Sequence, residues 1–193
     1  MKTKHYILCL VFLSFSLFSN AQKFDKLDKS PMDRAYYPAN AAKRTFIKSA
    51  TKKAAAQPKI RVTYSRPAKK GREVFGKLLK YEEAWRIGAN ESTEILFMTD
   101  VLFGNTEIKA GRYSLIIIPF ENEWVLKLNT ALDGWGNYGY DSSKDIASIT
   151  APVKKDEKTI ENLSMSLYEA QDNIIHLKIG WDTSSAEFPI HLK

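Results

Sequence analysis

The chain has 193 residues and carries 29 lysines and arginines against 22 aspartates and glutamates, a formal net charge of +7. Its one cysteine, Cys9, excludes an internal disulfide framework and a zinc site built from several cysteines. The length suits one well-filled domain, which must therefore be stabilised by its hydrophobic core.

The first residues have the layout of a secretory signal. Two lysines precede an apolar run over residues 6–18, and Ser19 and Ala21 are small residues suited to a cleavage site. The run is shorter than the roughly 20 residues that a membrane-spanning helix needs. We therefore expect a signal peptide at 1–21 and an exported mature chain, periplasmic or extracellular, without a transmembrane segment.

Residues 22–58 are interpreted as an N-terminal arm and basic linker. A solvated linker or an exposed short helix explains the stretch most simply, and adsorption to an acidic cell surface is the alternative. We expect no nucleic-acid partner, because no RNA- or DNA-binding motif accompanies the charge. The cations lie among alanines and are Lys43, Arg44, Lys48, Lys52 and Lys53.

From residue 59 to residue 193, the predicted domain, apolar and polar residues alternate in short segments. This period of two predicts strands with one face on a core and the other toward water. The alternating segments are 60–65, 124–129, 163–168, 175–181 and 188–192.

Two further segments, 95–98 and 115–118, are apolar on both faces and are predicted to be central strands. Turn signals stand at 104–105 and at 172–173. Apolar spacing within 71–84 suggests one or two helical turns. Eight or nine short strands predict an all-β fold, an antiparallel β-sandwich or jelly roll, with this short helical segment between the first two predicted strands.

The stretch before the first central strand concentrates side chains suited to a site: Arg72, Trp85, Arg86, Asn90 and Glu91. As a binding site, Arg72 and Arg86 would clamp an anion, because a guanidinium fork suits a carboxylate or phosphate. Glu91 would then be an acid, a base or a polar anchor. The alternative is a structural corner, in which Trp85 fills a gap and Arg86 pairs with Glu91 or caps loop carbonyls.

A second candidate is the glycine-rich stretch 133–141, which carries Trp135, Tyr138 and Tyr140. Their rings would stack on the apolar faces of sugars. The alternative is a tight loop whose aromatic rings fold back onto the sheet. A calcium loop is not expected, because Trp135 stands where a second oxygen ligand belongs.

Other chemistry lacks the residues it needs. His176 and His191 both fall on the polar phase of their predicted strands, so we expect surface histidines, no metal site and no cofactor. A glycosidase needs two carboxylates facing each other. Glu91, Asp133 and Asp141 are the residues that would supply them.

These same stretches make the chain resemble the bacterial DUF2911 family, domains of unknown function common in exported proteins of Bacteroidetes. The resemblance implies an exported, β-rich domain and attaches no activity to it. It marks the run Trp-Arg-Ile-Gly-Ala-Asn-Glu at 85–91 as a family hallmark. The matching stretches are 30–33, 36–38, 64–67, 71–76, 85–91, 110–115 and 135–141.

The leading functional expectation is an exported, non-enzymatic module that binds a small polar ligand, a glycan or a partner protein of the envelope through the two candidate loops. A hydrolase acting on carbohydrate or envelope polymers is the first alternative, with Glu91, Asp133 or Asp141 as acid or base. A structural or assembly role, with the basic arm as a tether, is the second.

Overall fold

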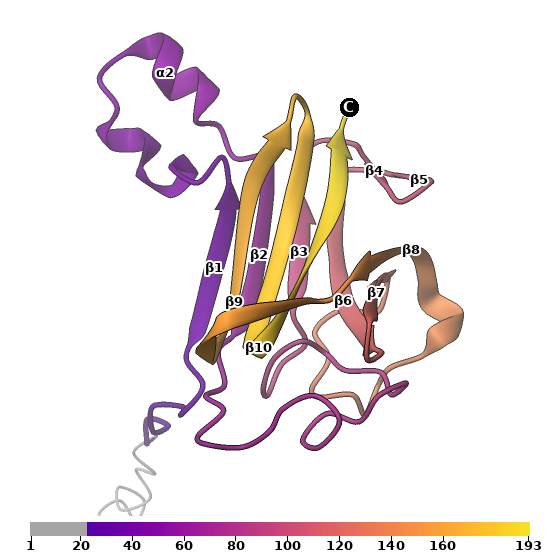
Figure 1. Ribbon diagram of the computed structural model, residues 1–193. Helices are drawn as coiled ribbons and strands as arrows, with labels where there is room; N and C mark the ends of the chain where they lie inside the picture. Colours follow the sequence, from indigo (N-terminus) through magenta and orange to yellow (C-terminus); the bar gives the residue numbers. More distant parts are fainter. Residues whose placement is uncertain (1–22) are drawn as a thin grey trace, which may run out of the picture.

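The computed structural model describes residues 23–193, so the predicted signal peptide at 1–21 lies outside the described residues. Two antiparallel sheets pack face to face (Figure 1). The six-stranded sheet has the order β1-β2-β3-β6-β7-β8, and the four-stranded sheet has the order β5-β4-β10-β9. The prediction of an all-β antiparallel sandwich is confirmed.

The strand bounds show how the chain divides between the two sheets. The six-stranded sheet contains β1 (Met32–Tyr37), β2 (Ile60–Ser65), β3 (Glu94–Phe97), β6 (Gly111–Pro119), β7 (Glu123–Asn129) and β8 (Asp145–Pro152). The four-stranded sheet contains β4 (Val101–Phe103), β5 (Thr106–Ile108), β9 (Lys154–Gln171) and β10 (Ile174–Leu192). Three short helices complete the described chain: η2 (Ala41–Phe46), α2 (Ala50–Ala55) and η3 (Ser142–Lys144).

The core lies between the sheets and follows the predicted alternation. Trp124, Leu126 and Leu128 of β7 are buried, as are Leu177 and Ile179 of β10. The two strands predicted to be central, β3 and β6, do lie in the interior of the six-stranded sheet. Full burial of a leucine or isoleucine contributes about 1.5–3 kcal/mol, so a core of this extent can stabilise the fold without disulfides.

The stretch 71–84 differs from the predicted helical turns. It forms a series of tight turns, in which Gly76 N–H donates to the Leu79 carbonyl (2.7 Å) and Leu79 N–H donates to the Val74 carbonyl (2.8 Å). Gly71 and Gly76 adopt φ values of 73° and 87°, which a right-handed helix does not contain. The short helices η2 and α2 lie earlier in the chain, between β1 and β2.

Strand β1 lies within the stretch interpreted as an arm. It pairs with β2 along its whole length, from Met32 opposite Ser65 to Tyr37 opposite Ile60, and forms the edge of the six-stranded sheet. The sheet therefore begins before residue 59. The alternation signal is weak here because the core-facing positions include the charged Asp33 beside Ala35 and Tyr37.

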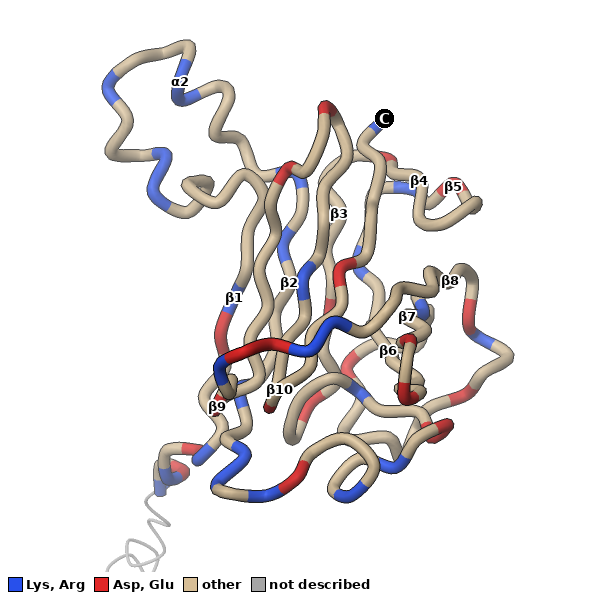
Figure 2. The backbone as a smooth tube through the Cα atoms, in the orientation of Figure 1, with Lys and Arg blue, Asp and Glu red and all other residues tan. Residues whose placement is uncertain are grey.

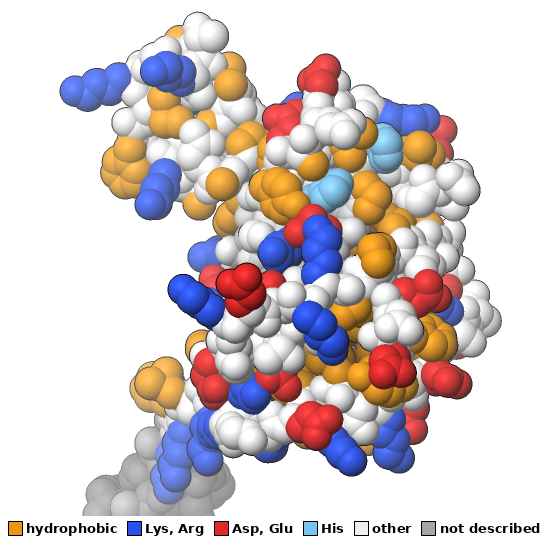
Figure 3. All heavy atoms as spheres, viewed as in Figure 1, with side chains coloured by type: hydrophobic (Ala, Val, Ile, Leu, Met, Phe, Trp, Pro, Cys, Tyr) orange, Lys and Arg blue, Asp and Glu red, His pale blue; other side chains and the backbone are white. Residues whose placement is uncertain are grey.

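The connection from β1 to β2 stands away from the sandwich and contains η2 and α2 (Figure 1). Blue segments mark its cations in the charge-coloured trace (Figure 2). In the space-filling view it protrudes from the body of the molecule (Figure 3). We call residues 38–59 the basic projection.

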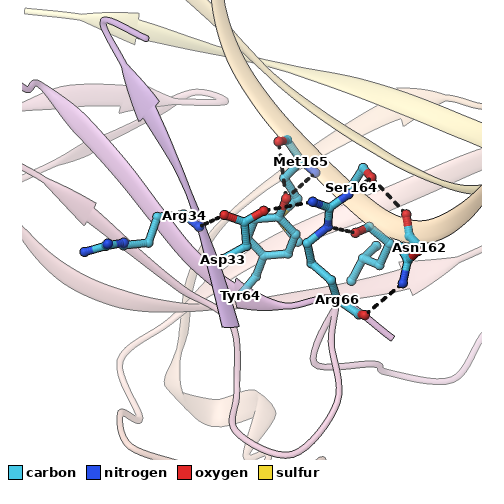
Figure 4. A network of polar contacts seen from close by, with 8 residues as sticks. Asp33, Arg34, Tyr64, Arg66, Asn162, Ser164 and Met165 are labelled. Atoms are coloured by element: carbon cyan, nitrogen blue, oxygen red, sulfur yellow. Dashed lines mark hydrogen bonds and ion pairs between the residues drawn. The ribbon is translucent and has the colours of Figure 1, made fainter. Parts of the chain in front are cut away.

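Arg66, directly after β2, ties the two sheets together at the β1 edge (Figure 4). Its guanidinium donates to Asp33 Oδ2 (2.9 Å), to Ser164 Oγ (2.8 Å) and to the Leu163 carbonyl (3.0 Å). Asp33 comes from β1, whereas Leu163 and Ser164 come from β9. This network joins the sheets beside a short backbone bridge between Ala68 and Asn162, and it anchors the segment that leads to Pro67.

Strand β10 joins two predicted segments into one bent strand. Register shifts flank Asp182, whose φ is 58°. The irregularity turns the Asp182 carboxylate toward the segment after β2, where it forms an ion pair with Lys69 and accepts a hydrogen bond from Val74 N–H (3.2 Å). Both side chains of the pair are largely buried. The bend of β10 therefore positions the loop between β2 and β3.

Candidate functional site

The two candidate loops meet at one end of the sandwich, the lower end in Figure 1. Asn137 Oδ1 accepts a hydrogen bond from Arg86 N–H (2.8 Å), and Asn137 Nδ2 donates to the Ala84 carbonyl (2.5 Å). Gly136 N–H donates to the Asn90 carbonyl (2.7 Å). Segments some fifty positions apart in the chain are thereby joined into one unit.

A cleft of about 420 Å³ opens beside this junction. Its volume lies within the usual range of small-molecule sites. Trp85, Trp181 and Leu79 contribute apolar surface to it. The two indole rings stack with their centroids 5.5 Å apart and an interplanar angle of 19°. The cleft therefore has a rigid wall, but Trp85 is only 6% and Trp181 only 2% exposed, so the edges of the two indoles and Leu79 are the apolar surface open to a ligand.

Trp85 is a structural residue as well as a lining residue. Its N–H and its carbonyl both bond to Ile117 of β6, each at 2.8 Å. The side chain is only 6% exposed, which fits the structural alternative, in which Trp85 fills a gap. Because Trp85 makes both of its backbone hydrogen bonds with β6, these bonds also fix the position of the next residue, Arg86, at the cleft.

The charged side chains that line the cleft are mostly basic. Arg72, Lys77, Lys80 and Arg86 line it, whereas Glu83 is its one lining carboxylate. Glu83 and Lys80 form an ion pair (3.5 Å), but both side chains are well exposed, so this contact neutralises little. The side chains that line the cleft therefore carry a net positive charge.

The Arg86 guanidinium is the least satisfied group of the cleft. Among residues 23–193 no hydrogen bond or ion pair reaches it, and its Nε is buried without an acceptor. Burial lowers the pKa of Arg86 from its ordinary value. Glu91 does not pair with it and instead lines a different cavity. A half-buried cation without a partner can gain free energy from an anionic ligand.

Strained backbone holds Arg86 in this position. Ile87 is fully buried and has a φ of 57°, and Asn90 has a φ of 62°. A β-branched residue rarely adopts the left-handed region, and such strain concentrates at ligand clamps and active sites. A methyl group at Gly88 would lie 2.9 Å from Ser65 Oγ, so this position accepts only glycine without a shift.

Arg72 adds positive charge to the cleft, but its guanidinium is already bonded within the protein. Its Nε donates to the Lys69 carbonyl (2.7 Å) and its Nη2 donates to the Ala68 carbonyl (2.8 Å). These bonds fasten the side chain to its own loop. Arg72 therefore shapes the wall of the cleft more than it serves as the predicted clamp.

The aromatic residues of the second loop differ from one another. Tyr140 folds back, with its hydroxyl donating to Asp145 Oδ2 (2.7 Å), and burial raises its pKa. Trp135 is 60% exposed and Tyr138 is 95% exposed. None of the three lines the 420 Å³ cleft. Tyr138 packs over Gly136, close to Arg86, and could form an edge of the binding surface.

The candidate carboxylates are only partly brought together. Glu91 and Asp133 line a second cavity of about 300 Å³, together with Glu94. Asp133 and Glu94 both pair with Arg112, at 2.8 Å and 3.4 Å. Asp141 caps η3, where hydrogen bonds from Ser143 lower its pKa.

No cluster of three or more histidines, aspartates and glutamates in residues 23–193 is arranged to hold a metal ion. No helix of this same region combines the length and apolarity needed to cross a bilayer.

Fold and site together define an antiparallel β-sandwich with a basic, tryptophan-walled cleft at one end. The chain belongs to the family described as protein of unknown function (DUF2911), whose model matches residues 47–190, and this confirms the resemblance noted in the sequence. The matched region contains β2 to β9, most of β10 and every residue that lines the cleft. No curated protein and no solved structure matches the chain.

Sequence reasoning missed several residues of the cleft. Lys77 and Lys80 lie in the stretch read as helical turns, and Trp181 was assigned only to the core. Asn137 was one polar residue in a loop chosen for its aromatic rings. A cluster of lysines near two arginines was the available signal for Lys77 and Lys80. Nothing local marked Asn137 or Trp181, because their roles depend on residues far away in the sequence.

Proposed function

We propose that this protein is exported and is a non-enzymatic binding module whose cleft takes a small polar ligand carrying an anionic group. The observation that supports this most directly is the half-buried Arg86 guanidinium, which lines the cleft without a partner in residues 23–193. Carboxylate and phosphate groups match a guanidinium fork and form short, charge-assisted hydrogen bonds with it.

The walls of the cleft indicate the rest of the ligand. Leu79 and the exposed edges of Trp85 and Trp181 suit a short aliphatic body or the edge of a ring. The lining lysines, Lys77 and Lys80, suit the anionic end. Small carboxylic acids, sugar phosphates and acidic saccharides such as uronic acids combine these two features. The acidic saccharides retain the glycan expectation, with the charge as the main determinant.

The carboxylates offer less support to the hydrolase alternative. Glu83 lies at the cleft but is exposed and paired with Lys80. Glu91 and Asp133 share the other cavity, where Asp133 is paired with Arg112. An acid–base pair acting on a ligand beside Arg86 would need carboxylates on the same cleft.

The test is a thermal-shift and calorimetric screen of the protein with small anions and their uncharged analogues: carboxylic acids against amides, sugar phosphates against sugars, and uronic-acid oligosaccharides against neutral ones. A ligand that binds the folded state raises its melting temperature. We expect anions to raise it and their neutral analogues to leave it unchanged. If no anion at millimolar concentration differs from its analogue, the proposal is wrong.

Arg86→Ala separates a clamp from a structural corner. We expect it to weaken binding of the best anion at least about tenfold, since a desolvated charge contact is lost. The unliganded variant should be as stable as the wild type or more stable, because an unsatisfied buried group is removed. Arg34→Ala, on exposed β1 surface, is the matched control and should retain both properties. Marked destabilisation of unliganded Arg86→Ala would support the corner instead.

A further inference from the structure

The basic projection is not needed to connect its strands. β1 and β2 are neighbouring antiparallel strands, which a two-residue turn could join. Residues 38–59 instead leave the sheet after Tyr37 and return to it at Ile60. They contain η2 and α2, and Ser49 caps α2 by accepting a hydrogen bond from Lys52 N–H (3.4 Å). An ordered extension of this size presents a surface to something outside the sandwich.

The charge of the projection is of a single sign. It contains no aspartate or glutamate, and the trace shows blue without red along it (Figure 2). None of its cations takes part in an ion pair within residues 23–193. The cations are Lys43, Arg44, Lys48, Lys52, Lys53 and Lys59.

An aromatic residue is exposed among these cations. Phe46, at the end of η2, is 84% exposed. Exposed alanines of α2, Ala50, Ala54 and Ala55, add small apolar surface between the lysines. The space-filling view shows apolar and basic side chains together on this protruding part (Figure 3). A soluble polyanion would use the charge alone, whereas a lipid interface uses charge and an inserted aromatic side chain.

We propose that the basic projection docks the protein on an anionic lipid bilayer, with its cations at the headgroups and Phe46 inserted between them. The geometry leaves the cleft accessible. The basic projection leads into one end of β2, and the chain that lines the cleft leaves the other end of β2. The basic projection and the cleft therefore lie at opposite ends of the sandwich (Figure 1). Docking would hold the cleft away from the membrane.

Co-sedimentation with vesicles tests the proposal. We expect the protein to bind phosphatidylglycerol-containing vesicles at low ionic strength, to bind pure phosphatidylcholine vesicles far less, and to be released by salt. Each cation near such a surface strengthens binding about fivefold. The double variant K43E/K52E should therefore bind at least about 25-fold more weakly.

The matched control is K144E/K158E, which makes the same change in net charge at exposed lysines outside the projection. We expect it to bind within about threefold of the wild type, since these residues do not face the proposed surface. Equal losses for the two double variants, or equal binding of the wild type to both kinds of vesicle, would overturn the proposal.

Phe46→Ser distinguishes a bilayer from a soluble polyanion. It keeps every charge, so binding to dextran sulfate should not change, whereas vesicle binding should fall several-fold because the aromatic insertion is lost. Circular dichroism confirms that each variant is folded. If Phe46→Ser leaves vesicle binding unchanged while dextran sulfate binds as tightly as the vesicles, the projection is a polyanion site and the bilayer proposal fails.

Discussion

Tyr64 shows how one side chain can join two sheets. It lies on β2 with only 3% of its surface exposed, and its hydroxyl meets the backbone of Met165 on β9. The hydroxyl accepts a hydrogen bond from Met165 N–H (2.9 Å) and donates to the Met165 carbonyl (3.4 Å). Burial raises the pKa of Tyr64, so the hydroxyl keeps the proton that it donates.

Tyr64→Phe should lower the free energy of unfolding by about 1–3 kcal/mol, because a buried backbone N–H loses this acceptor. Urea denaturation followed by circular dichroism measures the change. Tyr113→Phe is the matched control, since the Tyr113 hydroxyl donates to the Lys109 carbonyl (3.0 Å) at an exposed site. Its loss should stay within about 0.5 kcal/mol. Equal losses in the two variants would contradict the proposed role of Tyr64.

Residue type indicated which side chains line the cleft better than it indicated which side chains pair. The sequence marks Arg86 as a candidate anion clamp because it stands in a stretch that concentrates arginine, tryptophan, asparagine and glutamate. That selection led to the cleft, whereas the Arg86–Glu91 contact of the structural alternative does not form among the described residues. A side chain's partner depends on the direction in which the backbone holds it, and here the left-handed Ile87 sets that direction.

Strand β1 is the element whose role differs most from expectation. It protects the edge of β2, and Tyr37 at its end donates a hydrogen bond from its hydroxyl to Glu169 Oε2 of β9 (2.8 Å). Asp33 at its start pairs with Arg66 (2.9 Å). β1 therefore contributes contacts to both sheets, although it precedes the part matched by the family model.

A chain that begins at residue 59 should be less stable than one that begins at residue 30. Without β1, the backbone groups of β2 become an open sheet edge, and buried contacts of Ala35 and Tyr37 are lost. We expect a loss of at least about 2 kcal/mol and a greater tendency to aggregate. Denaturation and size-exclusion chromatography of the two chains measure these effects. If both chains have the same stability, β1 is dispensable.

At the scale of the whole molecule, the hydroxyls of Tyr37 and Tyr64 tie the two sheets together, and we expect the titration of Tyr37 to weaken the fold at alkaline pH. Burial and the hydrogen bond to Glu169 raise the pKa of Tyr37 from 10 to about 12. The folded chain therefore holds this proton more tightly than the unfolded chain. The resulting stabilisation is complete below pH 10 and is lost as the pH rises from 10 to about 12.

Tyr37→Phe should flatten the loss of stability between pH 10 and about 12, because the group that titrates there is removed. Melting temperatures measured from pH 8 to pH 12 provide the comparison. Tyr36→Phe, on the opposite face of β1, is the matched control and should keep the alkaline slope of the wild type. An unchanged slope in Tyr37→Phe would show that other groups set the limit.

At acid pH the stability depends on pH in the opposite direction, through Asp145. Burial acts to raise the pKa of Asp145, but hydrogen bonds from Lys127, Asn129 and Tyr140 outweigh it, and the net pKa is lowered. The stabilisation from Asp145 is therefore present above its ordinary pKa and is lost as the pH falls through the lowered value.

The strands and turns whose signals are local could be predicted from the amino-acid sequence. The alternation in β2, β7 and β10, the two-sided apolar runs of β3 and β6, and the turn at 104–105 predicted an antiparallel sandwich. Both candidate loops were also visible, because clusters of tryptophan, arginine and glycine stand out within a few positions. Period and turn chemistry act between near neighbours in the chain, so they can be read without coordinates.

Which of these parts meet depends on the three-dimensional packing of the chain. The contact of Arg86 with Asn137, the stacking of Trp85 on Trp181 and the pairing of β1 join residues that are far apart in the chain. The bend of β10 at Asp182 positions the loop between β2 and β3, and no local pattern in the sequence indicates this bend. Such contacts follow from how twisted sheets pack and where their ends converge, and one side chain's identity does not specify that geometry.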